Sequence, residues 1–575
     1  MTRNRYVPFL VSFLIFSCTA TQKNNNQLPG VDPFRYSIQK KVVAVNGAVV
    51  SAHPLASQVG ISILKQGGNA FDAAIATQLA LAVVYPNAGN LGGGGFLIGR
   101  SQDGKTVAID YREMAPGHSH RDMYIDSSGT ARTDKSQAGH LASGVPGTVA
   151  GLFASAKYGK LSFDKLIQPA IELAEKGFVI TEREAGSLND LQNDLKKYNT
   201  MMPVFVNNSG WKAGDTLVQA DLAATLKRIK ANGAAGFYEG ETARLIVEEM
   251  KRGSGIISYG DLKSYQAKMR DPHSFSYKGY TVVGMPMPSS GGILLHQMMA
   301  MIAERNIGAM GFHSPQATQL MVEAERRAFA DRAEYMGDAD FYNVPVAMLT
   351  DKHYLQQRMK NFDASRATPS SMIKPGKVEM IHESVETTHL SVIDKDGNAV
   401  AVTTTLNDSY GSRTVVGGAG FFLNDEMDDF SIKPGVPNMY GAIGGDANAI
   451  QAGKRMLSSM SPTIVLKDNK PYLVVGTPGG TTIPTSVFQT LVNIIEFNMT
   501  TEDAVNQPKF HHQWLPDTVE VENGFPVQTI AAMQKMGYRF NERSGIGRTE
   551  VIKVLPDGKF EAVADHRGED DARGW

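Results

Sequence analysis

Apolar and polar positions alternate from Thr387 to Asn407, in the stretch TTHLSVIDKDGNAVAVTTTLN. A period of two predicts β-strands, and the polar run DKDGN between the two halves predicts a hairpin turn. If an odd-length loop is centred on Asp396, Thr387 lies directly opposite Thr405, with Cβ atoms about 4.5 to 5.5 Å apart. A two-residue loop would instead shift the register by one residue and turn Thr405 to the other face.

Helix and strand signals alternate over the rest of the chain. Residues 55–85 predict two helices separated by a Gly-Gly pair, with Asn69 as the N-cap of the second helix. Ser314 as N-cap and Pro315 in the first turn predict a long helix through MVEAERRAFADRAEYM. Residues 472–475 predict a strand that leads through a glycine turn into another helix.

A polar segment without periodicity, residues 364–386, contains prolines and predicts a linker. Strand signals resume directly after it. The chain therefore divides functionally at or near residue 386.

Composition narrows the class of protein. The 575 residues suffice for several structural layers, or for two or more pieces of about 100 to 200 residues each. The formal net charge of -1 argues against a nucleic-acid partner. Cys18 is the single cysteine of the sequence, so no disulfide can form within it.

The first 18 residues have the form of an export leader. Arg3 and Arg5 precede an apolar run over residues 6–16, which is too short for a bilayer span of about 20 apolar residues. The sequence LIFSC resembles a loose lipobox, in which cleavage before Cys18 frees a thiol for acylation. Ordinary cleavage after Ala20 is the alternative. We expect an exported protein, periplasmic or anchored to the envelope by a lipid on Cys18, with residues 19–40 as a polar tether.

A threonine hydroxyl needs a base within hydrogen-bonding distance before it acts as a nucleophile. The α-amine of the same residue, with an unperturbed pKa of about 7.7 to 8.0, is suitable near neutral pH. That amine is free only after the chain is cut before the threonine. Thr387 could bring about this cut by attacking the carbonyl of Glu386, after which water would hydrolyse the ester.

Several further strings carry a resemblance to a known family. They are QGGNAFDAAIATQLALAVVYPNAGNLGGGGF, DYREMAP, LASGVPGTVAGL, GDTLVQADLA, PSSGGI, LNDEMDDFS, KPGVPNMYGAIGGDANA, RMLSSMSPTIV, GTPGG and FHHQWLPD. Together with the hairpin, they make the chain similar to the bacterial γ-glutamyltranspeptidases from about residue 40 to the C-terminus. The order and number of these strings, rather than any one of them, carry the resemblance.

The resemblance implies an α+β fold, a four-layer αββα sandwich of the N-terminal nucleophile hydrolase type, formed jointly by a large subunit (41–386) and a small subunit (387–575). It implies an autoproteolytic cut between Glu386 and Thr387, and a heterodimer of the two products. Thr387 would then attack the γ-carbonyl of a donor such as glutathione. Water or the amine of an amino acid or peptide would resolve the acyl-enzyme. No cofactor or metal is implied.

The resemblance also assigns roles to individual residues. Thr405 would hydrogen-bond the nucleophile, and the amides of Gly479 and Gly480 would form the oxyanion hole, where one donor typically contributes about 100- to 1000-fold in rate. The donor's α-carboxylate and ammonium would be held by Arg112, Ser458, Ser459, Asn407, Glu426 and Asp429. Residues 434–445 match a lid over the donor, with Tyr440 as a latch against Asn407.

This set suits the substrate chemically. A γ-linked glutamyl group presents an ammonium and a carboxylate on one carbon, and a guanidinium with two acidic residues is the complementary arrangement. Without the resemblance, an arginine after a strand, a Ser-Ser turn and Asn or Asp in turns would be ordinary structural residues.

Two other motifs favour structural roles. NLGGGGF, residues 90–96, lacks the GK[ST] ending of a phosphate loop. His511 and His512 are adjacent, so on a strand they face opposite ways and do not form a metal pair.

Alternatives to the transpeptidase hypothesis are a cephalosporin, glutaryl or poly-γ-glutamate hydrolase on the same scaffold, and an uncleaved lipoprotein that binds γ-glutamyl peptides without catalysis.

Overall fold

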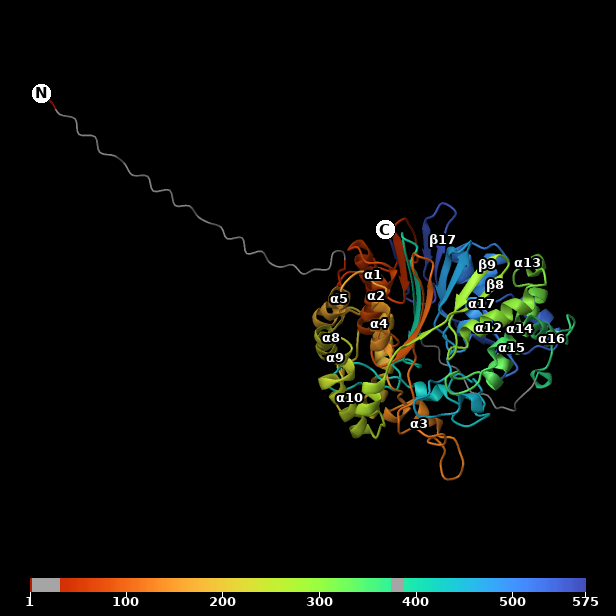
Figure 1. Cartoon of the computed structure of the whole chain (residues 1–575), viewed down its shortest axis with the longest axis horizontal. Coiled ribbons are helices and arrows are strands. Elements are labelled where there is room, and N and C mark those ends of the chain that lie inside the picture. The colour runs from red at the N-terminus through yellow and green to blue at the C-terminus, as the bar shows by residue number, and fades with distance from the viewer. Residues whose placement is uncertain (3–30, 374–386) are drawn as a thin grey trace.

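Figure 1 shows the computed structural model of the chain, which describes residues 1–2, 31–373 and 387–575. The predicted leader with Cys18, and residues 374–386 of the predicted linker, lie outside the described residues. The earlier part of the linker, 364–373, contains one short 3-10 helix, Ser370–Met372. Within the described ranges, no helix combines the length and apolar character needed to cross a membrane.

The first of two large sheets holds the predicted hairpin. Its strands are β2 (Gly47–Ser51), β3 (Gly94–Arg100), β4 (Thr106–Tyr111), β7 (Lys268–Arg270), β10 (Thr388–Asp394), β11 (Ala399–Thr405) and β19 (Asp571–Gly574). They run in the order β19-β2-β10-β11-β3-β4-β7, with every neighbouring pair antiparallel. The hairpin therefore occupies the middle of the sheet.

The second large sheet stacks on the first. Its strands are β1 (Lys41–Ala44), β8 (His273–Tyr277), β9 (Tyr280–Gly284), β12 (Thr463–Lys467), β13 (Lys470–Gly476), β17 (Glu550–Val554) and β18 (Phe560–Val563). Their order is β1-β18-β17-β13-β12-β9-β8. Buried side chains from both sheets, including Val50, Ile98, Ile464 and Ile552, form one cluster between them.

Helices cover the outer face of each sheet (Figure 1). On the first sheet lie α1 (Pro54–Lys65), α2 (Ala70–Val84) and α4 (Thr148–Ala156); on the second lie α12 (Gly291–Ile302), α14 (Pro315–Tyr335) and α17 (Thr482–Ile495). Each helical layer has its own buried apolar cluster against its sheet. The four layers confirm the predicted αββα sandwich, and each sheet takes strands from both sides of residue 386.

The remaining elements surround these layers. The helices are α3 (Thr133–Gln137), α5 (Phe163–Lys176), α6 (Glu182–Asp190), α7 (Gln192–Tyr198), α8 (Ala220–Asn232), α9 (Ala235–Tyr238), α10 (Gly240–Gly253), α11 (Tyr259–Ser264), α13 (Ile307–Met310), α15 (Val346–Leu349), α16 (Lys352–Arg358), α18 (Thr501–Asn506) and α19 (Val527–Lys535). The short strands are β5 (Phe178–Val179), β6 (Thr216–Leu217), β14 (Phe510–His511), β15 (Val519–Glu522) and β16 (Phe540–Arg543).

Local sequence signals place several of these elements as predicted. Asn69 caps α2 through its side-chain oxygen, which accepts from the amides of Phe71 and Asp72 at 3.0 Å. Ser314 caps α14, whose first residue is Pro315. Both caps satisfy amide groups that an isolated helix end leaves unpaired, which fixes where these helices begin.

The hairpin register is the odd-loop alternative. Thr388 pairs with Thr404, and the pairing continues in step to Ile393 and Ala399. The Asp394 carboxylate accepts hydrogen bonds from the amides of Asp396 (2.9 Å) and Asn398 (3.0 Å), and so stabilises the turn. The next pair outward is Thr387 with Thr405, so the predicted register is confirmed.

Candidate active site

Two threonine hydroxyls meet at the open end of the β10–β11 hairpin. Thr387 Oγ1 donates to Thr405 Oγ1 at 3.4 Å, and both residues are buried, with 3% of their surface exposed. Thr405 Oγ1 also accepts from the backbone amide of Asn407 at 2.8 Å. Asn407 has a φ of 86°, a left-handed conformation that asparagine tolerates better than most residues. The chain therefore turns away from β11 directly behind Thr405.

A glycine loop links β13 to α17 beside these threonines. Gly479 has a φ of 138° and Gly480 a φ of 55°. A Cβ on Gly479 would lie 2.4 Å from Thr482 Oγ1, and one on Gly480 would lie 2.8 Å from the Tyr440 ring. Both positions therefore require glycine on conformational and steric grounds. Gly480 and Thr481 line the same cavity as Thr387, whereas Gly479 lies one residue outside its wall.

Arg112, directly after β4, is the central cation of this cavity. Its Nη1 lies 2.6 Å from Glu426 Oε2, and its Nη2 lies 2.5 Å from Asp429 Oδ2. Glu113 is a third carboxylate, 3.5 Å from Nη1. Burial alone would lower the pKa of Arg112, but the three carboxylates raise it above its usual range. Arg112 therefore stays charged inside the protein.

The acidic partners are less well compensated than Arg112. Burial raises the pKa of Glu426 well above its usual range, while Arg112 lowers it. Burial likewise raises the pKa of Glu113, again opposed by Arg112. Arg112 thus faces three carboxyl groups, Glu113, Glu426 and Asp429.

Two serines and a second arginine form another part of the cavity wall. The backbone carbonyl of Ser458 accepts from the amide and hydroxyl of Ser290, at 2.8 Å each. Ser459 Oγ accepts from Arg332 Nη2 at 3.2 Å. Burial lowers the pKa of Arg332 to about 10, with Asp429 opposing this shift. Arg332 thus remains a cation at neutral pH.

Sequence reasoning did not single out Arg332, Asn438 or Glu113. Arg332 lies in α14, in the string ADRAEY, and 8% of its surface is exposed. The sequence offered one signal for Arg332, which is that an arginine stands among the buried positions of a helix. Asn438 Nδ2 donates to Asp429 Oδ1 at 3.0 Å, a contact from the 434–445 segment to the 3-10 helix Glu426–Asp429 that only the fold reveals.

The 434–445 segment covers the cavity. Tyr440 donates its hydroxyl to the Asn407 carbonyl at 2.6 Å, and its own carbonyl accepts from Gln513 at 3.0 Å. The Asn407 side chain donates to the Asp425 carbonyl at 3.2 Å. The enclosed volume is about 20 Å³, which is room for about one water molecule. A glutamyl group would therefore enter only if this cover or the ion pairs move.

The cavity brings together nearly all the residues that the family resemblance assigned. Its lining includes Arg112, Thr387, Thr405, Asn407, Glu426, Asp429, Tyr440, Ser458, Ser459 and Gly480. Gly479 is the assigned residue outside the wall.

The two adjacent histidines lie elsewhere and have their own partners. His511 contacts Thr485 Oγ1 at 2.8 Å and Gln513 at 2.9 Å, and His512 Nδ1 accepts from the Trp514 amide at 3.0 Å. In the described part of the chain, no group of three or more His, Cys, Asp or Glu is arranged to hold a metal ion.

The fold and the site define a class before any relative is considered. A four-layer αββα sandwich with a threonine at the start of a central strand, beside a second threonine and a glycine loop, is that of the N-terminal nucleophile hydrolases. The family model for gamma-glutamyltranspeptidase matches residues 56–575. The chain belongs to the gamma-glutamyltranspeptidase family and is an enzyme.

Individual relatives agree with this assignment. A glutathione hydrolase proenzyme of Escherichia coli (strain K12) is 47% identical over 557 residues, covering 94% of this chain and 95% of that protein. The crystal structure of a cephalosporin acylase from Bacillus halodurans superposes with a TM-score of 0.82 at 26% identity, covering 95% of this chain and 99% of that one. The Helicobacter pylori gamma-glutamyltranspeptidase structure gives a TM-score of 0.56 at 43% identity, over 60% of this chain and 97% of that one.

Removing the Tyr440 hydroxyl tests the cover. In Tyr440→Phe, the buried Asn407 carbonyl loses its donor, which typically costs about 1 to 3 kcal/mol. We expect the KM for a γ-glutamyl donor to rise about 5- to 100-fold. Steady-state kinetics with glutathione measures this change. The matched control is Tyr36→Phe. It removes a hydrogen bond of 2.6 Å from the Tyr36 hydroxyl to the Val179 carbonyl, and neither of these residues lines the cavity. An unchanged KM in Tyr440→Phe would contradict a role for this bond in holding the cover closed.

Proposed function

We propose that the chain is a precursor that cuts itself between Glu386 and Thr387 and then acts as a γ-glutamyltransferase and glutathione hydrolase. The observation that carries the proposal is the hydroxyl pair of Thr387 and Thr405 in a cavity whose wall contains a buried guanidinium and two carboxylates. Relatives named glutathione hydrolase proenzyme support both parts of it.

The cut proceeds through an ester. Thr387 Oγ attacks the carbonyl carbon of Glu386, the bond from that carbon to the Thr387 nitrogen breaks, and the hydroxyl proton passes to the freed amine. Water then hydrolyses the ester between Glu386 and the Thr387 oxygen. The products are the large chain, which ends in a carboxylate at Glu386, and the small chain, which begins with the amine of Thr387.

Catalysis then uses that amine as the base. It takes the Thr387 hydroxyl proton as Oγ attacks the γ-carbonyl of the donor. The amides of Gly479 and Gly480 stabilise the oxyanion, and Thr405 orients Oγ. The proton passes to the departing amine, which for glutathione is that of the dipeptide. Water or an acceptor amine attacks the γ-glutamyl ester and regenerates Thr387.

Donor recognition is an exchange of ion-pair partners. The donor's α-carboxylate pairs with Arg112 and accepts hydrogen bonds from Ser458 and Ser459. Its ammonium pairs with Glu426 and Asp429 beside Asn407. Arg112 is paired with those two carboxylates in this structure. A zwitterion therefore inserts without leaving a buried charge unpaired. A plain peptide lacks one of the two charges and would leave a partner uncompensated.

The site favours this activity over the alternatives on the same scaffold. A glutaryl donor lacks the ammonium, so it gives Glu426 and Asp429 no new partner when its carboxylate pairs with Arg112 in their place. A polymer needs an open cavity, whereas this one is covered by Tyr440. A binding protein without catalysis would have no use for a threonine pair next to the chain segment at which the cut is proposed.

Thr387→Ala should remain one polypeptide and hydrolyse no glutathione, because the attacking oxygen is gone. A denaturing gel and a glutathione assay read out both effects, and the wild type should give two bands. The matched control is Thr388→Val: Thr388 is fully buried, and its Oγ1 has no hydrogen-bond partner among the described residues. An uncut wild-type chain that still hydrolyses glutathione would contradict the mechanism.

Asp429→Asn should weaken the preference for glutathione over donors that lack an ammonium group, since it removes a charge from the ammonium site and keeps the side-chain shape. We expect kcat/KM for glutathione to fall about 10- to 100-fold, as for loss of a charge-assisted hydrogen bond of about 1.5 to 3 kcal/mol. The kcat/KM for a glutaryl amide should fall much less. Asp446→Asn is the control, an exposed acid paired with Arg121 outside the cavity. Equal losses of kcat/KM for both substrates would mean that Asp429 does not recognise the ammonium of the donor.

We further propose that the enzyme is exported and that a lipid on Cys18 anchors it to the envelope. The arginines and the short apolar run before the cysteine support this proposal. The intact mass of the mature large chain should equal that of residues 18–386 plus the acyl groups carried by Cys18. A mass that begins at Thr21 without acyl groups would show ordinary cleavage instead.

A further inference from the structure

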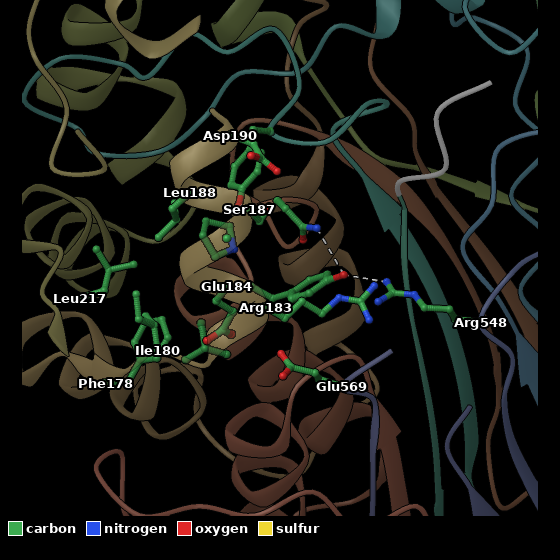
Figure 2. A pocket seen from close by; sticks show the side chains of 16 residues that line it. Phe178, Ile180, Arg183, Glu184, Ser187, Leu188, Asp190, Leu217, Arg548 and Glu569 are labelled. Carbon is green, nitrogen blue, oxygen red and sulfur yellow. Dashed lines mark hydrogen bonds between the residues drawn. The ribbon is translucent and has the colours of Figure 1, made fainter. Parts of the chain in front are cut away.

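A larger cavity lies on the helical side of the first sheet and shares no lining residue with the Thr387 cavity (Figure 2). Its volume is about 380 Å³, within the range of about 300 to 1,000 Å³ typical of small-molecule sites. Its walls come from the end of α2, from β5, β6 and α6, and from Tyr410, Arg548 and Glu569. We call it the α6 cavity.

Charged side chains of both signs line the α6 cavity. Arg183 and Arg548 point toward one another in Figure 2. Arg548 Nη2 donates to the Tyr85 hydroxyl at 2.7 Å, which fixes its position. Glu569 accepts from Thr181 Oγ1 at 2.9 Å. Burial and the like charge of Glu184 raise the pKa of Glu569. The cavity is thus lined by two cations, Arg183 and Arg548, and by three carboxylates, Glu184, Glu569 and Asp190, and such a mixed set is complementary to a zwitterion.

Glu184 is one of the carboxylates in the cavity wall. Its Oε2 accepts from the Thr181 amide at 2.8 Å. Its Oε1 is buried and lies 3.1 Å from His53 Nε2, whose ring accepts from the Leu55 amide at Nδ1. An ammonium group at Glu184 would therefore share this carboxylate with His53.

An apolar wall faces the arginine side of the cavity. Phe178, Ile180, Leu188 and Leu217 lie together on the side of the view opposite Arg548 (Figure 2). All four belong to the apolar cluster between the helices and the first sheet. A ligand with an apolar side chain as well as both charges would match the whole cavity.

We propose that the α6 cavity binds apolar amino acids and short peptides. The carboxylate lies between Arg183 and Arg548, the ammonium at Glu184 and Glu569, and the side chain against the apolar wall. Such molecules are acceptors and products of the proposed reaction, so a regulatory role for their binding rests on the proposed function. Their binding to the α6 cavity does not depend on that function.

Two sets of contacts connect the α6 cavity to the catalytic loops. The Arg548 amide donates to Thr477 Oγ1 at 2.7 Å, directly before the Pro478-Gly479-Gly480 loop. A Cβ on Gly479 would lie only 3.4 Å from the Gly547 Cα, so the two loops are in close contact.

The second set runs through Tyr410. Its amide donates to the Asn87 carbonyl at 2.8 Å, and its hydroxyl lies 2.8 Å from Ser187 Oγ on α6. Tyr410 follows Asn407 by three residues, and the Asn407 carbonyl holds Tyr440. A ligand that orders Arg548 and Tyr410 therefore also orders the glycine loop and the base of the cover.

Calorimetric titration of the mature protein with leucylglycine tests the site without any turnover. Gly186 lies on α6 in the cavity wall, and a Cβ there would have no atom within 4 Å. Gly186→Leu should therefore fill the cavity without strain and weaken binding at least tenfold. Gly260→Leu, at an exposed glycine of α11, should bind as the wild type does.

Arg183→Gln tests the carboxylate position, since Arg183 is exposed and its loss should leave the fold intact. We expect binding at least fivefold weaker, with Arg244→Gln, an exposed arginine of α10, as the control. Wild-type affinity in both Gly186→Leu and Arg183→Gln would overturn the proposal. This result is independent of the gel and glutathione assays, so failure of the site and failure of the proposed function are distinguishable.

Hydrogen exchange tests the coupling. Leucylglycine should slow amide exchange in residues 477–480 and 408–410 of the wild type but not of Gly186→Leu. No change in the wild type at a saturating peptide concentration would overturn the coupling.

Discussion

The antiparallel register of β10 and β11 is the constraint on which the site depends. It sets Thr387 opposite Thr405 at the end of the hairpin, with the hydroxyls 3.4 Å apart. A shift of one residue would turn one hydroxyl toward the opposite face of the sheet. The sheet resists that shift because β2 and β3 pair on either side of the hairpin and helices and strands bury both its faces. The position of Thr387 is thus maintained by the whole sandwich.

Charge compensation is the second constraint. Arg112 is buried among Glu426, Asp429 and Glu113, and burial of such groups is costly unless they are paired. These ion pairs are suited to be exchanged for those of a zwitterionic donor. In the proposed mechanism, selectivity for a γ-glutamyl group follows from the cost of an uncompensated charge, in a cavity that Tyr440 partly covers.

The glycine loop connects these features to the rest of the molecule. Gly480 packs against the Tyr440 ring, and Gly479 packs against Gly547. The loop therefore lies between the cover on one side and the α6 cavity on the other. Movements of the cover and occupancy of that cavity both act on the same few backbone amides, which gives a physical basis for communication between them.

Local patterns in the sequence determined the hairpin and its turn, the Asn69 and Ser314 caps, and the alternation of helices and strands, because each depends on residues close together in the chain. The sequence strings that resemble the γ-glutamyltranspeptidases indicated the αββα sandwich and the residues of the site. Only the tertiary structure placed Arg112 between Glu426 and Asp429, and only it revealed the roles of Arg332 and Asn438 and the α6 cavity. The contacts of Arg112 and Arg332 join segments more than a hundred residues apart, and all of these arrangements depend on how loops and layers pack, which no local periodicity encodes.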